Sequence, residues 1–130
     1  MPNIIRKTSA TIVEVHRGVM DSVRWPARSG IWSPPTDVFE TDNEYVIRVE
    51  IGGMRDEDIE VAYDQGIIMI SGVRREKAER RAYHQMELRF GKFAVAVGLP
   101  GQVDLENSMA EYADGFLTVN LPKIIEKGGV

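Results

Sequence analysis

The residue types that most often carry out chemistry in proteins are scattered along this sequence rather than grouped. The two histidines, His16 and His84, are far apart, and neither stands in a metal-binding spacing such as H-E-x-x-H. We interpret both as surface or interface residues. The chain has no cysteine, which excludes disulfides and thiolate metal sites and is compatible with a reducing compartment. We therefore expect no metal site.

An acidic triplet and two small-residue pairs are the remaining candidates for chemistry. Asp56-Glu57-Asp58 lacks the glycine and the downstream ligands of an EF-hand loop, so we interpret it as a solvated turn that caps a helical turn before Ile59. Ser71-Gly72 lacks the flanking residues of a nucleophile elbow, and Gly52-Gly53 lacks the lysine and spacing of a phosphate loop. Because no nucleophile, base and acid cluster, we expect a binding protein with no catalytic residue and no cofactor.

Length and composition set the broad class. The 130 residues, of which 43% are hydrophobic, fit one domain with a modest core and an appendage. A net charge of -4 removes the main electrostatic argument for nucleic-acid binding. No apolar run approaches the roughly 18 residues of a membrane span, so we expect a cytoplasmic protein with no membrane span.

The first 33 residues differ from the rest and are predicted to form a flexible or partly helical N-terminal arm. They hold both tryptophans and show no strong strand alternation. Ile12, Val15, Val19 and Val23 recur at offsets of three and four, as along one stripe of a short helix. Pro34-Pro35 then stiffens the chain and marks the expected domain boundary.

After the prolines the pattern changes to a period of two, which is typical of half-buried strands. Short strands of this kind, separated by turn residues, predict an antiparallel β-sandwich. The expected strands are residues 45–51, 59–63, 67–70, 93–99, 109–113 and 116–121, with turns at Asp64-Gln65-Gly66 and at Gly115.

The connection Arg74 to Arg89 is too long and too charged for a tight hairpin. Within it Tyr83, His84, Met86 and Leu88 are compatible with one further strand, which we expect to leave the body of its own domain. From Arg74 to Lys92 the net charge is +4, whereas from Asp37 to Asp64 it is -8. The two segments either attract each other across an interface or form two solvated faces.

Several motifs occur in an order and at spacings that resemble the small heat shock protein family, the alpha-crystallin domain chaperones, in its bacterial and plant-like branch. The resemblance covers Trp32 to Lys123. The motifs are Trp32-x-Pro34-x-x-Asp37-x-x-Glu40, Asp58-Ile59-x-Val61, Ile70-Ser71-Gly72-x-Arg74, Gly91-x-Phe93, Leu99-Pro100, and Ala110, Gly115, Leu117, Val119 and Pro122-Lys123. This predicts an arm over residues 1–33, an alpha-crystallin domain over 34–123 and a short C-terminal tail over 124–130.

The resemblance implies an all-β, immunoglobulin-like sandwich that acts without ATP. Such proteins bind partly unfolded client proteins and keep them from aggregating, as homodimers or higher homo-oligomers. In the plant-like branch the long loop carries a strand that pairs with the first strand of the partner subunit. Here the exchanged strand would include Tyr83, His84, Met86 and Leu88, and its target would include Val38, Phe39 and Glu40. The alternative function is a non-catalytic adaptor, similar to co-chaperone sandwiches, that binds one folded partner.

A groove and its occupant complete the expected sites. The groove would lie between the strand of Ile59, Val61 and Tyr63 and the short strand of Ala110 and Tyr112. The family usually fills it with a C-terminal Ile-x-Ile or Ile-x-Val motif, which this tail lacks because Ile124 and Ile125 are adjacent. Val13-Glu14-Val15 in the arm is an alternative occupant, unless it is an ordinary β-branched stretch. The arm residues expected to plug the groove or contact clients are Ile12, Val13, Val15, Val19 and Trp25.

Two further positions depart from the family pattern. Val95 stands where the family commonly has an arginine that helps to organise the dimer, and Gly52 stands where it commonly has a proline. An apolar Val95 is either part of the core or covered by the arm.

Overall fold

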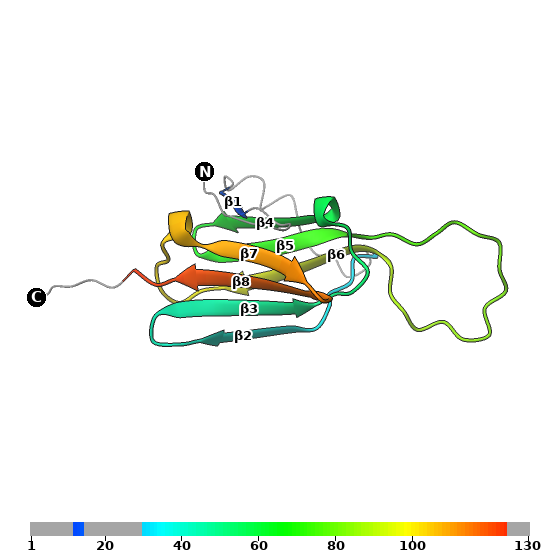
Figure 1. The fold of residues 1–130 in the computed structure, drawn as a ribbon, viewed down its shortest axis with the longest axis horizontal. Coiled ribbons are helices and arrows are strands. Elements are labelled where there is room, and N and C mark those ends of the chain that lie inside the picture. The colour runs from blue at the N-terminus through cyan, green and yellow to red at the C-terminus, as the bar shows by residue number, and fades with distance from the viewer. Residues whose placement is uncertain (1–11, 15–29, 125–130) are drawn as a thin grey trace, which may run out of the picture.

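The chain folds into two facing β-sheets, from which one long loop projects (Figure 1). The computed structural model describes residues 12–14 and 30–124. One sheet has the order β1-β4-β5-β6 and the other the order β2-β3-β8-β7. The strands are β1 (Ile12–Glu14), β2 (Thr36–Glu40), β3 (Glu44–Glu50), β4 (Ile59–Asp64), β5 (Ile67–Arg74), β6 (Gly91–Gly98), β7 (Met109–Ala113) and β8 (Phe116–Pro122), with 3-10 turns η1 (Asp56–Asp58) and η2 (Leu105–Asn107).

The alternation in the sequence becomes the inner and outer faces of the sheets. In β6, Phe93, Val95 and Val97 are buried on the inner side, as their spacing predicts. In the other sheet, β3 pairs with β8 so that Ile47 lies opposite Val119, and both are completely buried. The predicted all-β sandwich is confirmed, and each of the six expected strands is present.

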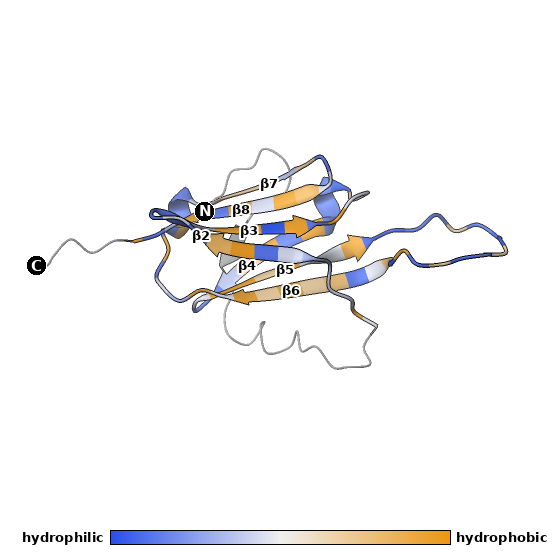
Figure 2. Ribbon diagram, turned by 90° about the horizontal axis from the view of Figure 1, so that it is seen from below, coloured by the Kyte–Doolittle hydropathy of each residue, from blue (hydrophilic) through white to orange (hydrophobic). Residues whose placement is uncertain are grey.

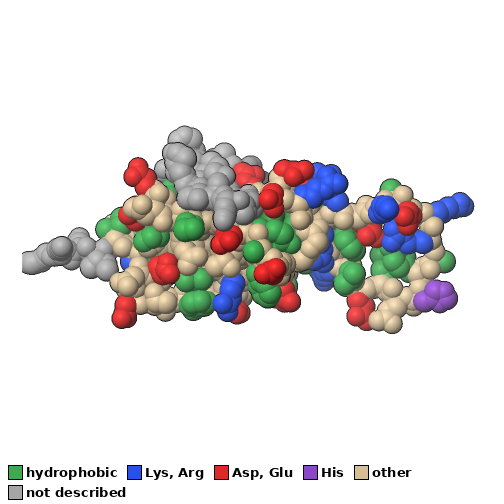
Figure 3. All heavy atoms as spheres, viewed as in Figure 1, with side chains coloured by type: hydrophobic (Ala, Val, Ile, Leu, Met, Phe, Trp, Pro, Cys, Tyr) green, Lys and Arg blue, Asp and Glu red, His purple; other side chains and the backbone are tan. Residues whose placement is uncertain are grey.

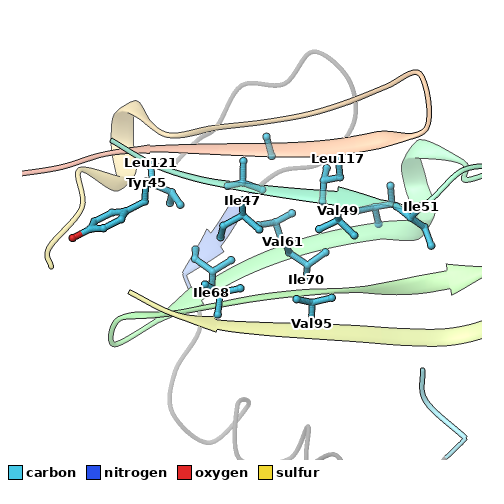
Figure 4. Close-up of a cluster of buried hydrophobic side chains, with 14 of the residues drawn as sticks. Tyr45, Ile47, Val49, Ile51, Val61, Ile68, Ile70, Val95, Leu117 and Leu121 are labelled. Atoms are coloured by element: carbon cyan, nitrogen blue, oxygen red, sulfur yellow. The ribbon is translucent and has the colours of Figure 1, made fainter. Parts of the chain in front are cut away.

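The core lies between the two sheets and takes side chains from β3 to β8 (Figure 4). Its largest fully buried members include Phe93, Ile47, Ile51, Ile68, Ile70, Leu117 and Leu121. Burying a side chain of this size stabilises the fold by roughly 1.5–3 kcal/mol. Val95 belongs to this cluster and lies opposite Ile70, so the position where the family commonly has an arginine is part of the apolar core here.

Two of the hairpins turn through two residues in the left-handed region. Asp114 and Gly115, with φ of 54° and 83°, join β7 to β8, and Gln65 and Gly66, with φ of 49° and 85°, join β4 to β5. Positive φ at both central residues is the type I′ geometry that matches the twist of paired strands. The predicted turns at Asp64-Gln65-Gly66 and Gly115 are therefore present.

Two local expectations differ from the structure. Ile12 lies in a short strand, not on a helical stripe, while Val15, Val19 and Val23 lie outside the described residues. Asp56–Asp58 forms the helical turn itself and makes no side-chain cap. Residues 83–88 form no strand within the single chain, because a lone extended segment has no neighbour there to accept its backbone hydrogen bonds.

Candidate functional site

The edges of the two sheets are the first candidate surface, because an edge strand offers unpaired backbone groups to another strand. In one sheet, β4 is covered by β1, which runs parallel to it with Ile12 opposite Val61 and Glu14 opposite Tyr63. At the other end of that sheet the Trp32 backbone accepts from the Ala94 amide at 2.9 Å and donates to the Lys92 carbonyl at 3.1 Å. The second sheet ends in β2 on one side and β7 on the other, and each of these pairs with one described strand.

The β2 edge exposes apolar side chains. Val38 is 48% exposed and Phe39 is 40% exposed. The Arg48 guanidinium lies 5.3 Å from the centre of the Phe39 ring and 3.8 Å from an Asp37 carboxylate oxygen. Because Val38 and Phe39 are consecutive in β2, their side chains point to opposite faces of the sheet, so this edge exposes apolar surface on both faces, with Asp37 and Arg48 beside it.

The third residue of the predicted target, Glu40, has a partner within its own chain. The Lys123 ammonium donates to the Glu40 carboxylate at 2.8 Å and to the Thr41 carbonyl at 2.8 Å. The hydrogen bond with Glu40 raises the pKa of Lys123. Because Lys123 closely follows β8, this pair fastens the end of β2 to the end of the last strand.

The loop between β5 and β6 projects away from the sandwich (Figure 2). It carries strongly exposed apolar side chains: Met86 is 70% and Leu88 72% exposed. His84 is exposed as well and, being two residues before Met86, would share its side in an extended strand. Met86 and Leu88 therefore leave most of their apolar surface in contact with solvent in the single chain.

Part of the loop is held by a cluster of polar side chains. The Tyr83 hydroxyl donates to Glu76 Oε2 at 2.7 Å, and Arg81 Nη1 donates to the Tyr83 hydroxyl at 3.1 Å. Arg81 also donates to the Lys77 carbonyl at 2.9 Å. The hydrogen bond to the Glu76 carboxylate raises the pKa of Tyr83. These hydrogen bonds join the outgoing side of the loop, at Glu76 and Lys77, to Arg81 and Tyr83 further along it.

Charge is divided between the loop and the sandwich, as the sequence suggests. Figure 3 shows acidic side chains spread over the visible face of the sandwich, whereas Lys and Arg gather mostly on the loop and near its base.

The expected groove residues come from two strands, β4 and β7, that lie in opposite sheets. Val61 and Ala110 are completely buried in the core, and Ile59 is nearly so. Tyr112 packs against the core and uses its hydroxyl within the chain, donating to the Ile51 carbonyl at 2.8 Å and accepting from the Met54 amide at 3.2 Å. The groove assignment stays a prediction, as do the domain boundaries. Of the expected arm residues, Ile12 and Val13 lie in β1, whereas Val15, Val19 and Trp25 lie outside the described residues.

Sequence reasoning missed one ion pair at the base of the loop. Arg75 binds Asp58 through two hydrogen bonds, Nε to Oδ2 at 2.7 Å and Nη2 to Oδ1 at 2.9 Å. These bonds lower the pKa of Asp58, since they stabilise its ionised form. The sequence held a signal for this pair. Asp58 precedes the first strand of a predicted hairpin and Arg75 follows the second, and the strand pairing, with Ile59 opposite Gly72, brings the two together.

Comparison with known proteins identifies the family. Residues 37–128 match the Hsp20/alpha crystallin family. The chain belongs to this family. It is 35% identical over 95 residues to small heat shock protein C4 of Rickettsia felis, an alignment that covers 72% of this chain and 58% of that protein. It is 37% identical over 99 residues to heat shock protein 16 of Schizosaccharomyces pombe, covering 73% of this chain and 69% of that one.

Solved structures of this small heat shock protein family have the same fold. Heat shock protein 16.0 from Schizosaccharomyces pombe superposes with a TM-score of 0.67 at 30% identity, covering 78% of this chain and 73% of that chain. A small heat shock protein from Xylella fastidiosa, whose structure is described as a distinct high order structure, gives 0.67 at 29% identity over 76% and 93%. The described part of the chain contains no helix long and apolar enough to cross a membrane.

Proposed function

We propose that this chain is an ATP-independent holdase, a non-catalytic cytoplasmic chaperone that binds partly unfolded proteins and prevents their aggregation. Membership of the small heat shock protein family supports a chaperone role. The observation that carries the proposal is that one chain has both an edge strand, β2, with exposed apolar side chains and a projecting loop whose apolar side chains are exposed as well. Both features suit binding to extended polypeptide, either a second copy or a client.

The active unit is a homodimer formed by strand exchange. Tyr83, His84, Met86 and Leu88 of one subunit extend along β2 of the other, where they meet Val38 and Phe39. The added strand occupies backbone groups at the β2 edge and covers apolar surface that the single chain exposes. Assembly beyond the dimer is supported by the high order structure described for the Xylella fastidiosa relative.

The arm supplies the second binding element. The pairing of β1 with β4 supports a role for Ile12 and Val13 as an internal occupant of the groove beside β4. Val15, Val19 and Trp25 of the arm are proposed to contact client proteins. The arm is the proposed occupant because β1 already lies beside β4, and release of β1 would uncover both the groove and the arm residues.

The chaperone proposal is tested by mixing the chain with a heat-labile enzyme without ATP and following light scattering on warming. We expect aggregation to be suppressed at equal mass, for several unrelated enzymes. Suppression of none would overturn the holdase proposal. If the chain instead binds one folded protein and fails with every unfolding enzyme, the adaptor function is correct.

The dimer proposal is tested by deleting residues 75–88 and measuring mass in solution. The full chain should be a dimer or larger at micromolar concentration, and the deletion variant should be a folded monomer. A full chain that is monomeric at this concentration would contradict strand exchange.

The arm proposal is tested by replacing Val13 and Val15 with serine. Loss of β-branched apolar residues should weaken the pairing of β1 with β4 and shrink the oligomers above the dimer. An unchanged size distribution would show that another segment fills the groove.

A further inference from the structure

One guanidinium group lies at the point where the long loop leaves the sandwich and returns to it. Arg74 is the last residue of β5 and pairs with Gly91, the first residue of β6, so these two residues close the stem of the loop. The pairing itself specifies where the loop begins. It does not specify the direction in which the sixteen-residue segment 75–90 leaves the body.

The Arg74 side chain binds the returning side of the loop. Its Nε donates to the Arg89 carbonyl at 2.9 Å, and its Nη2 donates to the same carbonyl at 2.6 Å. The guanidinium also lies 5.2 Å from the centre of the Phe90 ring. Residues 89 and 90 are therefore held by hydrogen bonds and by stacking at once.

The same group reaches two other segments. It lies 4.8 Å from the centre of the Trp32 ring, and Nη1 donates to the Gly52 carbonyl at 3.3 Å. Trp32 is fastened in turn, since its indole Nε1 donates to the Gly91 carbonyl at 3.4 Å and its ring packs 5.8 Å from that of Phe93. Arg74 thus contacts the loop, the turn after β3 and the junction between arm and sandwich.

A lysine cannot make this set of contacts. A guanidinium is planar, stacks on aromatic rings and presents several N–H donors in a fixed fork, whereas an ammonium is a compact, strongly hydrated charge. The contacts to the Arg89 carbonyl, the Gly52 carbonyl and two rings use all of these properties. The geometry therefore requires arginine, and not only a positive charge.

We propose that Arg74 is the positioning residue that sets the direction of the loop between β5 and β6. Arg74 also couples this loop to Trp32, where the arm joins the sandwich. This inference rests on the proposed strand exchange. A loop whose stem is already oriented loses less conformational freedom when it reaches a partner, so subunits associate more tightly. Because Trp32 and Phe90 contact the same guanidinium, displacement of the arm junction also loosens the loop, and assembly responds to the state of the arm.

The test compares Arg74→Lys with Arg55→Lys in the full chain. Arg55 is a matched control, because its side chain is 65% exposed and its ion pair with Glu57 is a long 3.9 Å. We expect Arg74→Lys to weaken the dimer about tenfold by sedimentation velocity. Hydrogen exchange at the amides of residues 86–91 should be faster than in the Arg55→Lys protein, with the core strands unchanged.

A double-mutant cycle separates positioning from general stabilisation. If Arg74 acts through the loop, Arg74→Lys and Phe90→Leu together should weaken the dimer by less than the product of their separate effects, and the same should hold with Trp32→Leu. If the effects of the paired substitutions on dimer affinity simply multiply, Arg74 is not coupled to Phe90 or Trp32.

Failure of this inference and failure of the proposed dimer give different results. If the full chain dimerises but Arg74→Lys matches Arg55→Lys in affinity and in loop exchange, the positioning role is wrong and strand exchange stands. If the full chain is a monomer, strand exchange is wrong. Hydrogen exchange in the monomer then decides alone whether Arg74 orients the loop. Faster exchange at residues 86–91 in the Arg74→Lys protein than in the Arg55→Lys protein supports this role, and equal exchange overturns it.

Discussion

At the scale of single residues, Gly72 occupies a place that admits no side chain. A Cβ at this position would collide with the Asp58 carbonyl oxygen and would come within 2.8 Å of Phe93 Cζ. Neither neighbour can yield, since one is backbone and the other is a buried ring, so Gly72→Ala should destabilise the fold by about 2 kcal/mol or more in urea unfolding. Gly98→Ala is the control, because a Cβ there meets nothing within 4 Å, and its effect should stay within about 0.5 kcal/mol. Equal effects would contradict this packing argument.

The pair of Asp58 and Arg75 predicts a pH dependence of stability. The Asp58 side chain is 8% exposed and its pKa is lowered in the folded chain by the hydrogen bonds from Arg75. A carboxyl with a lower pKa in the folded state stabilises the fold above its unfolded pKa, about 3.9, and this contribution is lost as pH falls through the folded pKa. Asp58→Asn should therefore lower the urea midpoint at pH 7, and its difference from the parent should narrow below about pH 4. If the difference in urea midpoint between Asp58→Asn and the parent does not change with pH, the loss of stability comes from packing and not from the charge of Asp58.

At the scale of elements, the two ends of the β2-β3-β8-β7 sheet should behave differently. Val38 on β2 and Met109 on β7 are similarly exposed, at 48% and 43%. A lysine on an edge strand blocks pairing with another strand, so Val38→Lys should weaken the dimer at least about tenfold in sedimentation velocity while Met109→Lys leaves it unchanged. Because both sites are exposed in the single chain, neither change should unfold the subunit. If Met109→Lys is the variant that dissociates the dimer, the exchange uses the opposite edge.

At the scale of the whole molecule, charge should affect how fast subunits meet more than how tightly they hold. The basic loop and the acidic segment around β2 lie in different parts of the molecule and attract over distances that salt screens. Raising salt from about 0.05 to about 0.5 M should slow association of fluorescently labelled subunits severalfold, with a smaller change in dissociation. Arg80→Gln, in the loop, should reduce this salt dependence. A salt effect confined to dissociation would show that charge acts inside the interface instead.

Much of the sandwich follows from local patterns in the sequence. The alternation of Phe93, Val95 and Val97 specifies one inner face, and turn residues such as Asp114-Gly115 specify where strands reverse. These signals are readable because each depends on neighbours within a few residues. The segments around Val38 and around Met86, which the family resemblance points to as the target and the exchanged strand, carry exposed apolar side chains in the structure, and their exchange stays a prediction.

What the sequence by itself determined is the sandwich architecture and the family. Tertiary structure alone decided that Ile12 pairs with β4 and that Asp58 meets Arg75. It also decided that Arg74 contacts Trp32, although the two residues are 42 positions apart in the chain. The physical reason is range: strand alternation and turns are local properties of the backbone, whereas these contacts exist only after the sheets have packed and brought distant segments together.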